Sequence, residues 1–160
     1  MKTVSMRDVR ILLHDIRSVY NTGAIFRTAD AIGASHIYLT GYTPTPVDRF
    51  GKHRTDFAKC ALGSENTLPW EAKKSPAALM KKLKSEGFQI VCVEQSPTSI
   101  DYKKFKPGKK TLVVFGNEVD GVPSTNLAKA DIVAEIPMRG MKESLNVSVS
   151  AGIVLFRWFD

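Results

Sequence analysis

Residues 111–123 read TLVVFGNEVDGVP, an apolar run that passes directly into asparagine, glycine and acidic residues. The run at 111–116 predicts a strand, and its apolar character throughout indicates burial on both faces. Such strands are typical of parallel sheets covered by helices, whose ligands bind beyond the carboxyl ends of the strands. The polar residues after this strand are therefore candidates for a functional site.

Apolar strands alternate with helices through the rest of the chain. We expect further strands at residues 9–13, 36–41, 88–94 and 131–138, and helices at 23–33, 76–86, 124–130 and from Ser144 to the end. Asn21 or Thr22 is the expected N-cap of the first helix, and Ser144 is a candidate N-cap of the last. Residues 42–70 follow no period and predict a surface connection with one helical turn, and residues 95–110 predict basic turns. The fold class is α/β, a mostly parallel sheet flanked by helices, in a single domain over residues 1–160.

The composition excludes several classes of protein. With 160 residues, 43% of them apolar, the chain is neither disordered nor built of repeats. Cys60 and Cys92 form no metal-binding cluster, so we expect no metal and two free, buried thiols in a reducing compartment. No apolar run is long enough for a membrane span or a signal peptide, so a cytoplasmic protein without a membrane partner is expected.

The charge permits a nucleic-acid partner. Lysine and arginine number 23 against 16 acidic residues, and the excess lies in residues 1–110, where basic residues outnumber acidic ones by 19 to 10.

Three segments follow predicted strands and carry polar residues: 17–34, 115–123 and 136–152. The first segment has no GxGxxG motif, so it does not predict the dinucleotide-binding site of an ordinary Rossmann domain. Gly116 and Gly121 have P-loop spacing, but Val122 and Pro123 stand where lysine and a hydroxyl residue are needed. There is also no GxSxG motif for a serine hydrolase.

Single residues in these segments admit a functional and a plain structural interpretation. Arg27 points away from the core face of its helix, toward a substrate or simply toward solvent. Glu118 and its neighbours suit either a site or a turn. The last helix is apolar on two sides, and because one domain has one core, its second side predicts contact with another subunit.

Taken together, NTGAIFRTADAIGA (21–34), LVVFGNEVDGVP (112–123) and IPMRGMKESLNVSVSAGIVLF (136–156) resemble the three motifs of the SpoU/TrmH family of the SPOUT superfamily of RNA methyltransferases. The resemblance implies an α/β sheet whose C-terminal segment forms a trefoil knot, a homodimer, and S-adenosylmethionine as cofactor. The motif positions imply these catalytic residues: Asn21, Arg27, Glu118, Ser144 and Asn146. They imply these cofactor-binding residues: Leu112, Phe115, Gly116, Asn117, Ile136, Pro137, Met138 and Leu145.

The implied reaction is methyl transfer to a ribose 2′-hydroxyl of tRNA or rRNA. The resemblance implies that Arg27 is essential, and the family often assigns it as a general base. Because a neutral guanidinium at pH 7 costs at least about 7 kcal/mol, we favour a role in holding the RNA phosphate and hydroxyl over the role as base. Two alternatives are a catalytically silent RNA-binding module of the same fold and a flavodoxin-like nucleotide binder.

Many family members have an N-terminal RNA-binding extension, and none is expected here, so the domain itself would have to hold the RNA. The candidates near the motif loops are Arg10, Arg17, Arg49, Lys52, Arg54, Lys59 and Arg139. A second basic group is formed by Lys103, Lys104, Lys106, Lys109 and Lys110, for which a solvated face is the alternative.

Overall fold

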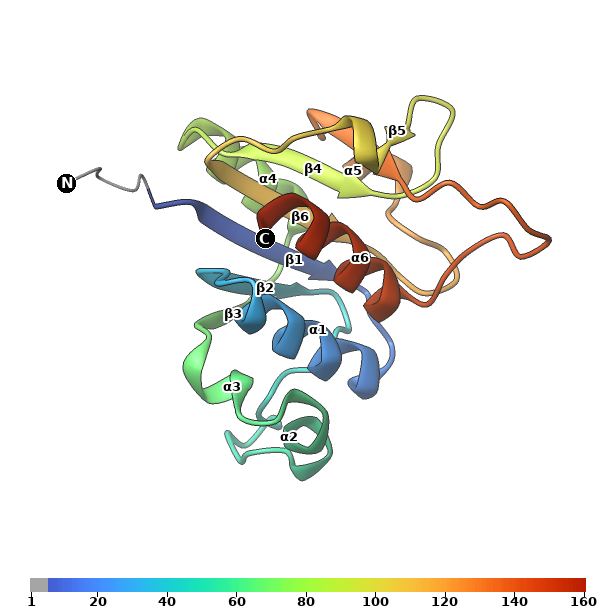
Figure 1. The fold of residues 1–160 in the computed structure, drawn as a ribbon. Helices are drawn as coiled ribbons and strands as arrows, with labels where there is room; N and C mark the ends of the chain where they lie inside the picture. Colours follow the sequence, from blue (N-terminus) through green and yellow to red (C-terminus); the bar gives the residue numbers. More distant parts are fainter. Residues whose placement is uncertain (1–5) are drawn as a thin grey trace.

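The computed structural model describes residues 6–160, and its centre is a seven-stranded sheet in the order β3-β2-β1-β6-β4-β7-β5 (Figure 1). All neighbouring strands are parallel. The strands are β1 (Asp8–His14), β2 (His36–Thr40), β3 (Trp70–Lys73), β4 (Gln89–Val93), β5 (Ile100–Asp101), β6 (Lys110–Phe115) and β7 (Ile132–Glu135). The helices are α1 (Val19–Ala31), α2 (Thr55–Ala61), α3 (Ser64–Thr67), α4 (Pro76–Ser85), the 3-10 turn η1 (Tyr102–Lys104), α5 (Ser124–Leu127) and α6 (Val147–Phe159). The predicted class, an α/β protein with a parallel sheet flanked by helices, is confirmed.

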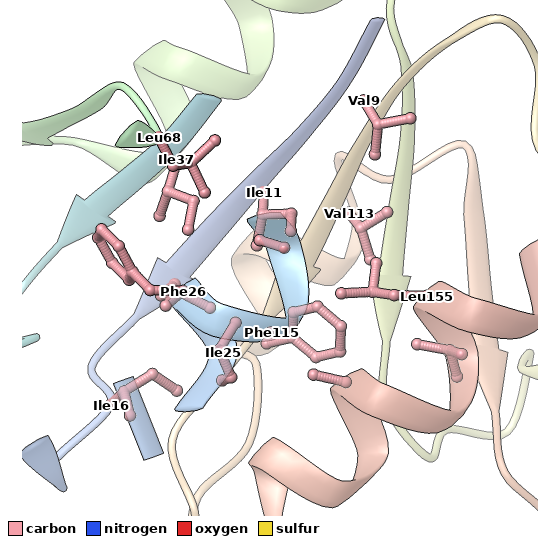
Figure 2. Close-up of a cluster of buried hydrophobic side chains, with 14 of the residues drawn as sticks. Val9, Ile11, Ile16, Ile25, Phe26, Ile37, Leu68, Val113, Phe115 and Leu155 are labelled. Carbon is pink, nitrogen blue, oxygen red and sulfur yellow. The ribbon is translucent and has the colours of Figure 1, made fainter. Parts of the chain in front are cut away.

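The central strands bury apolar residues on both faces because both faces of the sheet are covered. In β1, Ile11 and Leu13 belong to the cluster that includes α1 and α6, whereas Leu12 between them belongs to the cluster of α4. Figure 2 shows part of the first cluster, in which Ile25 of α1 and Leu155 of α6 lie around Ile11 and Phe115. An alternating strand would have left one face of this sheet polar.

The segment between β7 and α6 brings α6 back across the sheet. Strand β7 lies beyond β4 from the centre, yet α6 packs against α1, which follows β1. In Figure 1 the intervening residues extend away from the sheet and return, so that α6 lies beside α1. The loops after β4, β6 and β7 are thereby gathered at one edge of the sheet.

The long connection at 42–70 is more ordered than predicted. It contains α2 and α3, and β3 begins at its last residue, Trp70. Strand β3 is four residues long at the edge of the sheet, and three of its residues are exposed, so it lacks the apolar pattern that revealed the central strands. Strand β5 was not predicted either, because its two residues form no apolar pattern.

Both predicted N-caps are wrong, by three or four residues in the first helix and by two in the last. Helix α1 begins at Val19, and its N-cap is Ser18, whose hydroxyl accepts from the Asn21 backbone N–H at 3.1 Å. Helix α6 begins at Val147, and its N-cap is Asn146 rather than Ser144. The first shift places Asn21 inside the helix, where its side chain is free to make other contacts.

The two thiols differ in burial. Cys92 is buried in β4, and burial raises the pKa of its thiol to about 12, whereas Cys60 in α2 is only half-buried, against the prediction. Within residues 6–160, no helix combines the length and apolar character needed to cross a bilayer.

Candidate active site

A cavity of about 770 Å³, counted with its open mouth, lies at the carboxyl edge of the sheet. Its walls come from the loops after β4, β6 and β7 and from the first turn of α6. The lining residues are Val93, Glu94, Gln95, Phe115, Gly116, Asn117, Glu118, Val119, Asp120, Gly121, Glu135, Ile136, Met138, Ser144, Leu145, Val147 and Ser150.

The charged residues that line the cavity are all acidic. Four carboxylates, those of Glu94, Glu118, Asp120 and Glu135, line the cavity, and of the residues at 6–160 no lysine or arginine does. Apolar side chains such as Phe115 supply the rest of the wall. The cavity therefore favours a ligand that is partly apolar and carries positive charge, and it disfavours a phosphate.

A tight turn after β6 shapes one wall. Asn117 and Gly121 exchange two backbone hydrogen bonds, at 3.1 and 2.9 Å. A Cβ at Gly116 would lie 2.4 Å from the Gly121 backbone, so only glycine allows the turn to close on the strand end. The Glu94 carboxylate accepts from the Val122 N–H at 2.9 Å and anchors the turn to the end of β4.

Glu118 joins this turn to the start of α1. Its carboxylate accepts from the backbone N–H groups of Arg17 at 3.0 Å and Ser18 at 3.2 Å, and from Asn21 Nδ2 at 3.0 Å. Burial acts to raise the pKa of Glu118, but these hydrogen bonds outweigh it and hold that pKa below its ordinary value. Glu118 is therefore a fixed anion near neutral pH.

Asn21 extends the contact to the last helix. Its Oδ1 accepts from Asn146 Nδ2 at 3.1 Å, while Asn146 Oδ1 accepts from the backbone N–H of Ser148 at 2.8 Å. Residues separated by as many as 125 positions in the sequence are thus joined in one chain, Glu118–Asn21–Asn146. Three of the five predicted catalytic residues meet in this way, and Ser144 lies on the cavity wall beside them.

Arg27 stands apart from the other four. It is exposed on α1, roughly 9 Å along the helix axis from Asn21, and it does not line the cavity. Among the described residues, its side chain makes no hydrogen bond or ion pair. Arg27 is therefore available to contact a ligand outside the cavity.

Most of the predicted cofactor-binding residues line the cavity. Those that do are Phe115, Gly116, Asn117, Ile136, Met138 and Leu145. Strand β7 ends at Glu135, earlier than predicted, which leaves Ile136 and Met138 in the loop. Leu112 lies instead in the core on the α4 side, and Pro137 is outside the lining.

The predicted RNA-holding residues are dispersed. Arg17 lies at the carboxyl edge, beside Glu118, and Arg49 and Lys52 lie on the connection after β2. Arg10 is not near the motif loops. It lies on the same sheet face as α4, where it pairs with Asp8 at 3.1 Å and donates to the Tyr38 hydroxyl at 2.8 Å.

The sequence predictions missed Glu94, Gln95 and Glu135 as lining residues. All three lie at or just after the ends of strands β4 and β7. The rule that ligands bind beyond the carboxyl ends of parallel strands pointed to these positions too, but Glu94 and Gln95 belong to no recognised motif.

Comparison with known proteins identifies relatives along nearly the whole chain. Residues 8–156 match the SpoU rRNA Methylase family. The tRNA (guanosine(18)-2′-O)-methyltransferase of Aquifex aeolicus is 32% identical over 150 residues, covering 94% of this chain and 68% of the relative. The 23S rRNA (guanosine-2′-O-)-methyltransferase RlmB of Neisseria meningitidis is 32% identical over 155 residues, covering 97% of this chain and 59% of the relative.

A solved structure shows the same arrangement of elements. The AdoMet-bound rRNA methyltransferase from Sinorhizobium meliloti superposes with a TM-score of 0.83 at 30% identity, covering 94% of this chain and 55% of that one. This chain thus spans between about half and two thirds of the length of these three proteins, and part of each has no counterpart here.

Proposed function

Because the chain belongs to the SpoU rRNA methylase family, we propose that it transfers a methyl group from S-adenosylmethionine to a ribose 2′-hydroxyl of tRNA or rRNA. The observation that carries the proposal is the cavity at the carboxyl edge, which is apolar in part, lined by carboxylates, and bordered by the Glu118–Asn21–Asn146 chain.

The cavity residues fit S-adenosylmethionine. Phe115, Ile136 and Leu145 supply apolar walls for an adenine, and the backbone of the Asn117–Gly121 turn supplies polar groups. The carboxylates of Glu94 and Glu135 suit hydroxyl and ammonium groups. When bound, the cofactor supplies the methyl group from a positively charged sulfonium.

The chain's own residues would position the acceptor. A ribose 2′-hydroxyl is weakly acidic, so alignment with the methyl donor supplies much of the rate enhancement. The hydrogen bonds from Glu118 to Asn21 and from Asn21 to Asn146 hold α1 and α6 together beside the cavity mouth. The position of these helices would determine where the sugar lies. Arg27, exposed and unpaired among residues 6–160, would hold a phosphate of the RNA.

Within residues 6–160, the site offers no cysteine nucleophile for methyl transfer to a base. Methyl transfer to a base ring carbon can use a nucleophilic cysteine that activates the ring. Cys92 is buried with its thiol pKa raised to about 12, and neither cysteine lines the cavity. A thiol held protonated in the core is not available as a nucleophile.

The knot and the dimer also belong to this proposal. Support for a trefoil knot comes from the return of the chain from β7, beyond β4, to α6 beside α1, with the loops of β4, β6 and β7 around one cavity. Support for a homodimer comes from α6, where Val149 and Phe156 are 49% and 45% exposed, and from Tyr20 on the neighbouring α1, 77% exposed. Residues 1–160 would act as one domain in each subunit.

The test is incubation with methyl-labelled S-adenosylmethionine and unmodified tRNA and rRNA transcripts. A 2′-O-methyl removes the nucleophile of alkaline cleavage, so the product is expected to yield a single alkali-resistant dinucleotide that carries the label. Label released as a methylated base would overturn the ribose assignment. RNA binding without transfer would favour a catalytically silent module.

A further inference from the structure

A second hollow lies beside the cavity, on the other side of the Asn117–Gly121 turn. It has a volume of about 720 Å³ counted with its open mouth, and it is lined by Arg17, Tyr42, Asn117 and Asp120. Asn117 and Asp120 line both spaces, so a single turn of chain separates them. A ligand larger than the first space can therefore contact both.

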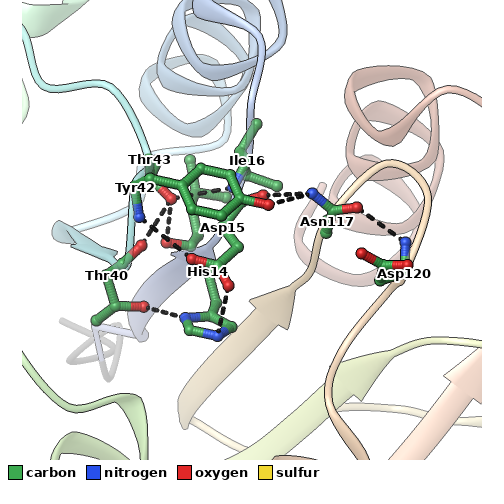
Figure 3. Close-up of polar contacts among 9 residues, drawn as sticks. His14, Asp15, Ile16, Thr40, Tyr42, Thr43, Asn117 and Asp120 are labelled. Atoms are coloured by element: carbon green, nitrogen blue, oxygen red, sulfur yellow. Dashed lines mark hydrogen bonds and ion pairs between the residues drawn. The ribbon is translucent and has the colours of Figure 1, made fainter.

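Tyr42 has an exposed ring, while its hydroxyl and its backbone N–H are both hydrogen-bonded. The side chain is 58% exposed. Its hydroxyl accepts from Asn117 Nδ2 at 2.7 Å, and its backbone N–H donates to Asp15 Oδ1 at 3.2 Å (Figure 3). The ring is thus fixed in place before any ligand arrives, which lowers the entropic cost of binding to its face.

The corner that holds Tyr42 is itself built for that position. Asp15 has a left-handed backbone, with φ of 54°, and its carboxylate lies 3.3 Å from His14 Nε2. Gly41, with φ of 64°, precedes Tyr42, and a Cβ there would collide with the Asp15 carboxylate. Two uncommon backbone conformations therefore place this one ring beside Asn117.

The lining combines the groups that recognise a nucleotide. A flat aromatic face stacks with a base, and an arginine pairs with a phosphate. Arg17 has no ion pair within residues 6–160, and its backbone N–H already donates to Glu118, so its position is tied to the active site. The Asp120 carboxylate in the lining argues against a bare anion and suits the amino group of a base.

We propose that this hollow binds one nucleotide of the RNA whose ribose 2′-hydroxyl is presented at the mouth of the cofactor cavity, with the base of that nucleotide stacked on Tyr42 and its phosphate at Arg17. The inference rests on the proposed function, because it requires RNA at the carboxyl edge of the sheet. It explains how a chain whose predicted RNA-holding residues are dispersed can hold the substrate close to the site of transfer.

The first experiment compares Tyr42→Phe with Tyr42→Leu. Both variants lose the hydrogen bond to Asn117, but only the leucine variant loses the ring. Affinity for unmodified tRNA and rRNA transcripts is measured together with the KM for RNA and, by calorimetry, the affinity for S-adenosylmethionine. Tyr42→Leu is expected to weaken RNA binding about tenfold, within the range for base–aromatic stacking, while Tyr42→Phe stays within about twofold of the wild type.

The second experiment compares Arg17→Gln with Lys81→Gln, an equal change of charge on α4, away from both spaces. Arg17→Gln keeps the backbone donor to Glu118, and it is expected to reduce the salt dependence of RNA binding by about one counterion, whereas Lys81→Gln does not. Equal RNA affinity in the two Tyr42 variants, or loss of S-adenosylmethionine affinity in both, would overturn the inference. Wild-type binding to RNA without transfer would overturn only the proposed function, and the Tyr42 comparison would still decide the inference.

Discussion

At the scale of single residues, Glu118 links the start of helix α1 to the start of helix α6. Its carboxylate takes two backbone donors and one amide from the start of α1, and through Asn21 it reaches Asn146 at the start of α6. An ionised acceptor strengthens each of these bonds, and its partial burial limits competition from water. One side chain therefore positions two helices around the cavity mouth.

Replacing Glu118 with glutamine tests this role. The amide can still accept, but its NH₂ then faces a backbone N–H, so we expect the free energy of unfolding to fall by about 1–2 kcal/mol at pH 7 and methyl transfer to fall sharply. Because the folded state lowers the pKa of Glu118, the wild-type advantage is full above the ordinary carboxyl pKa, about 4.3, and is lost as pH falls through the folded value. Denaturant titrations of both proteins from pH 7 to pH 3 measure it, and a constant difference across that range would refute the assignment.

Arg27 presents the opposite case, a residue without structural partners. Since it is exposed and lies outside the cavity, Arg27→Ala should leave the free energy of unfolding within about 0.5 kcal/mol and the affinity for S-adenosylmethionine unchanged. Transfer to RNA should fall by orders of magnitude if the guanidinium holds a phosphate. Calorimetry that finds weakened cofactor binding in this variant would place Arg27 in the cofactor site instead.

At the scale of elements, the sequence pattern identified the buried parts and missed the edge. Strands β1, β4 and β6 carry buried apolar residues on both faces, so their apolar runs located them within one or two residues. Strand β3 and helix α2 carry mixed, largely exposed residues, and only their pairing with β2 and α1 makes them regular. In the site, Asn21 and Glu118 could be predicted from motifs, whereas Tyr42 depends on the contact of residues 75 positions apart.

The turn after β6 gives a prediction for a whole element. In Gly116→Ala the new Cβ would lie 2.4 Å from the Gly121 backbone, and no rotamer can relieve a backbone clash. We expect a loss of about 3 kcal/mol in the free energy of unfolding and a loss of cofactor affinity of tenfold or more. Gly140→Ala is the matched control, since a Cβ there meets nothing within 4 Å, and both proteins are compared by thermal melting and calorimetry. Equal behaviour of the two variants would show that the turn adapts.

At the scale of the whole molecule, the path of the chain is the feature least accessible to sequence patterns. Strand β1 has apolar residues on both faces, Ile11 and Leu13 on one and Leu12 on the other. This predicts that both faces of the sheet are covered, and the structure confirms it. Nothing local in residues 136–146 predicts that they carry α6 back to α1, because that return depends on packing between elements far apart in the sequence. Only the resemblance to a known family implied a knotted C-terminal segment.

The last prediction concerns assembly. Helix α6 buries Leu155 and Trp158 in the core, yet it leaves Val149 and Phe156 about half exposed, beside the exposed Tyr20 of α1. Exposed apolar side chains on two packed helices are typical of an interface, so the wild type should sediment at about 35 kDa, twice the 17.7 kDa of one chain. Phe156→Glu should give a folded monomer at the single-chain mass, because the charge is tolerated in water but not between two apolar faces. Phe50→Glu, a change at an exposed aromatic residue on the connection after β2, should remain a dimer, with circular dichroism checking the fold of each variant. A wild-type protein that stays monomeric at micromolar concentration would remove α6 from consideration as an interface.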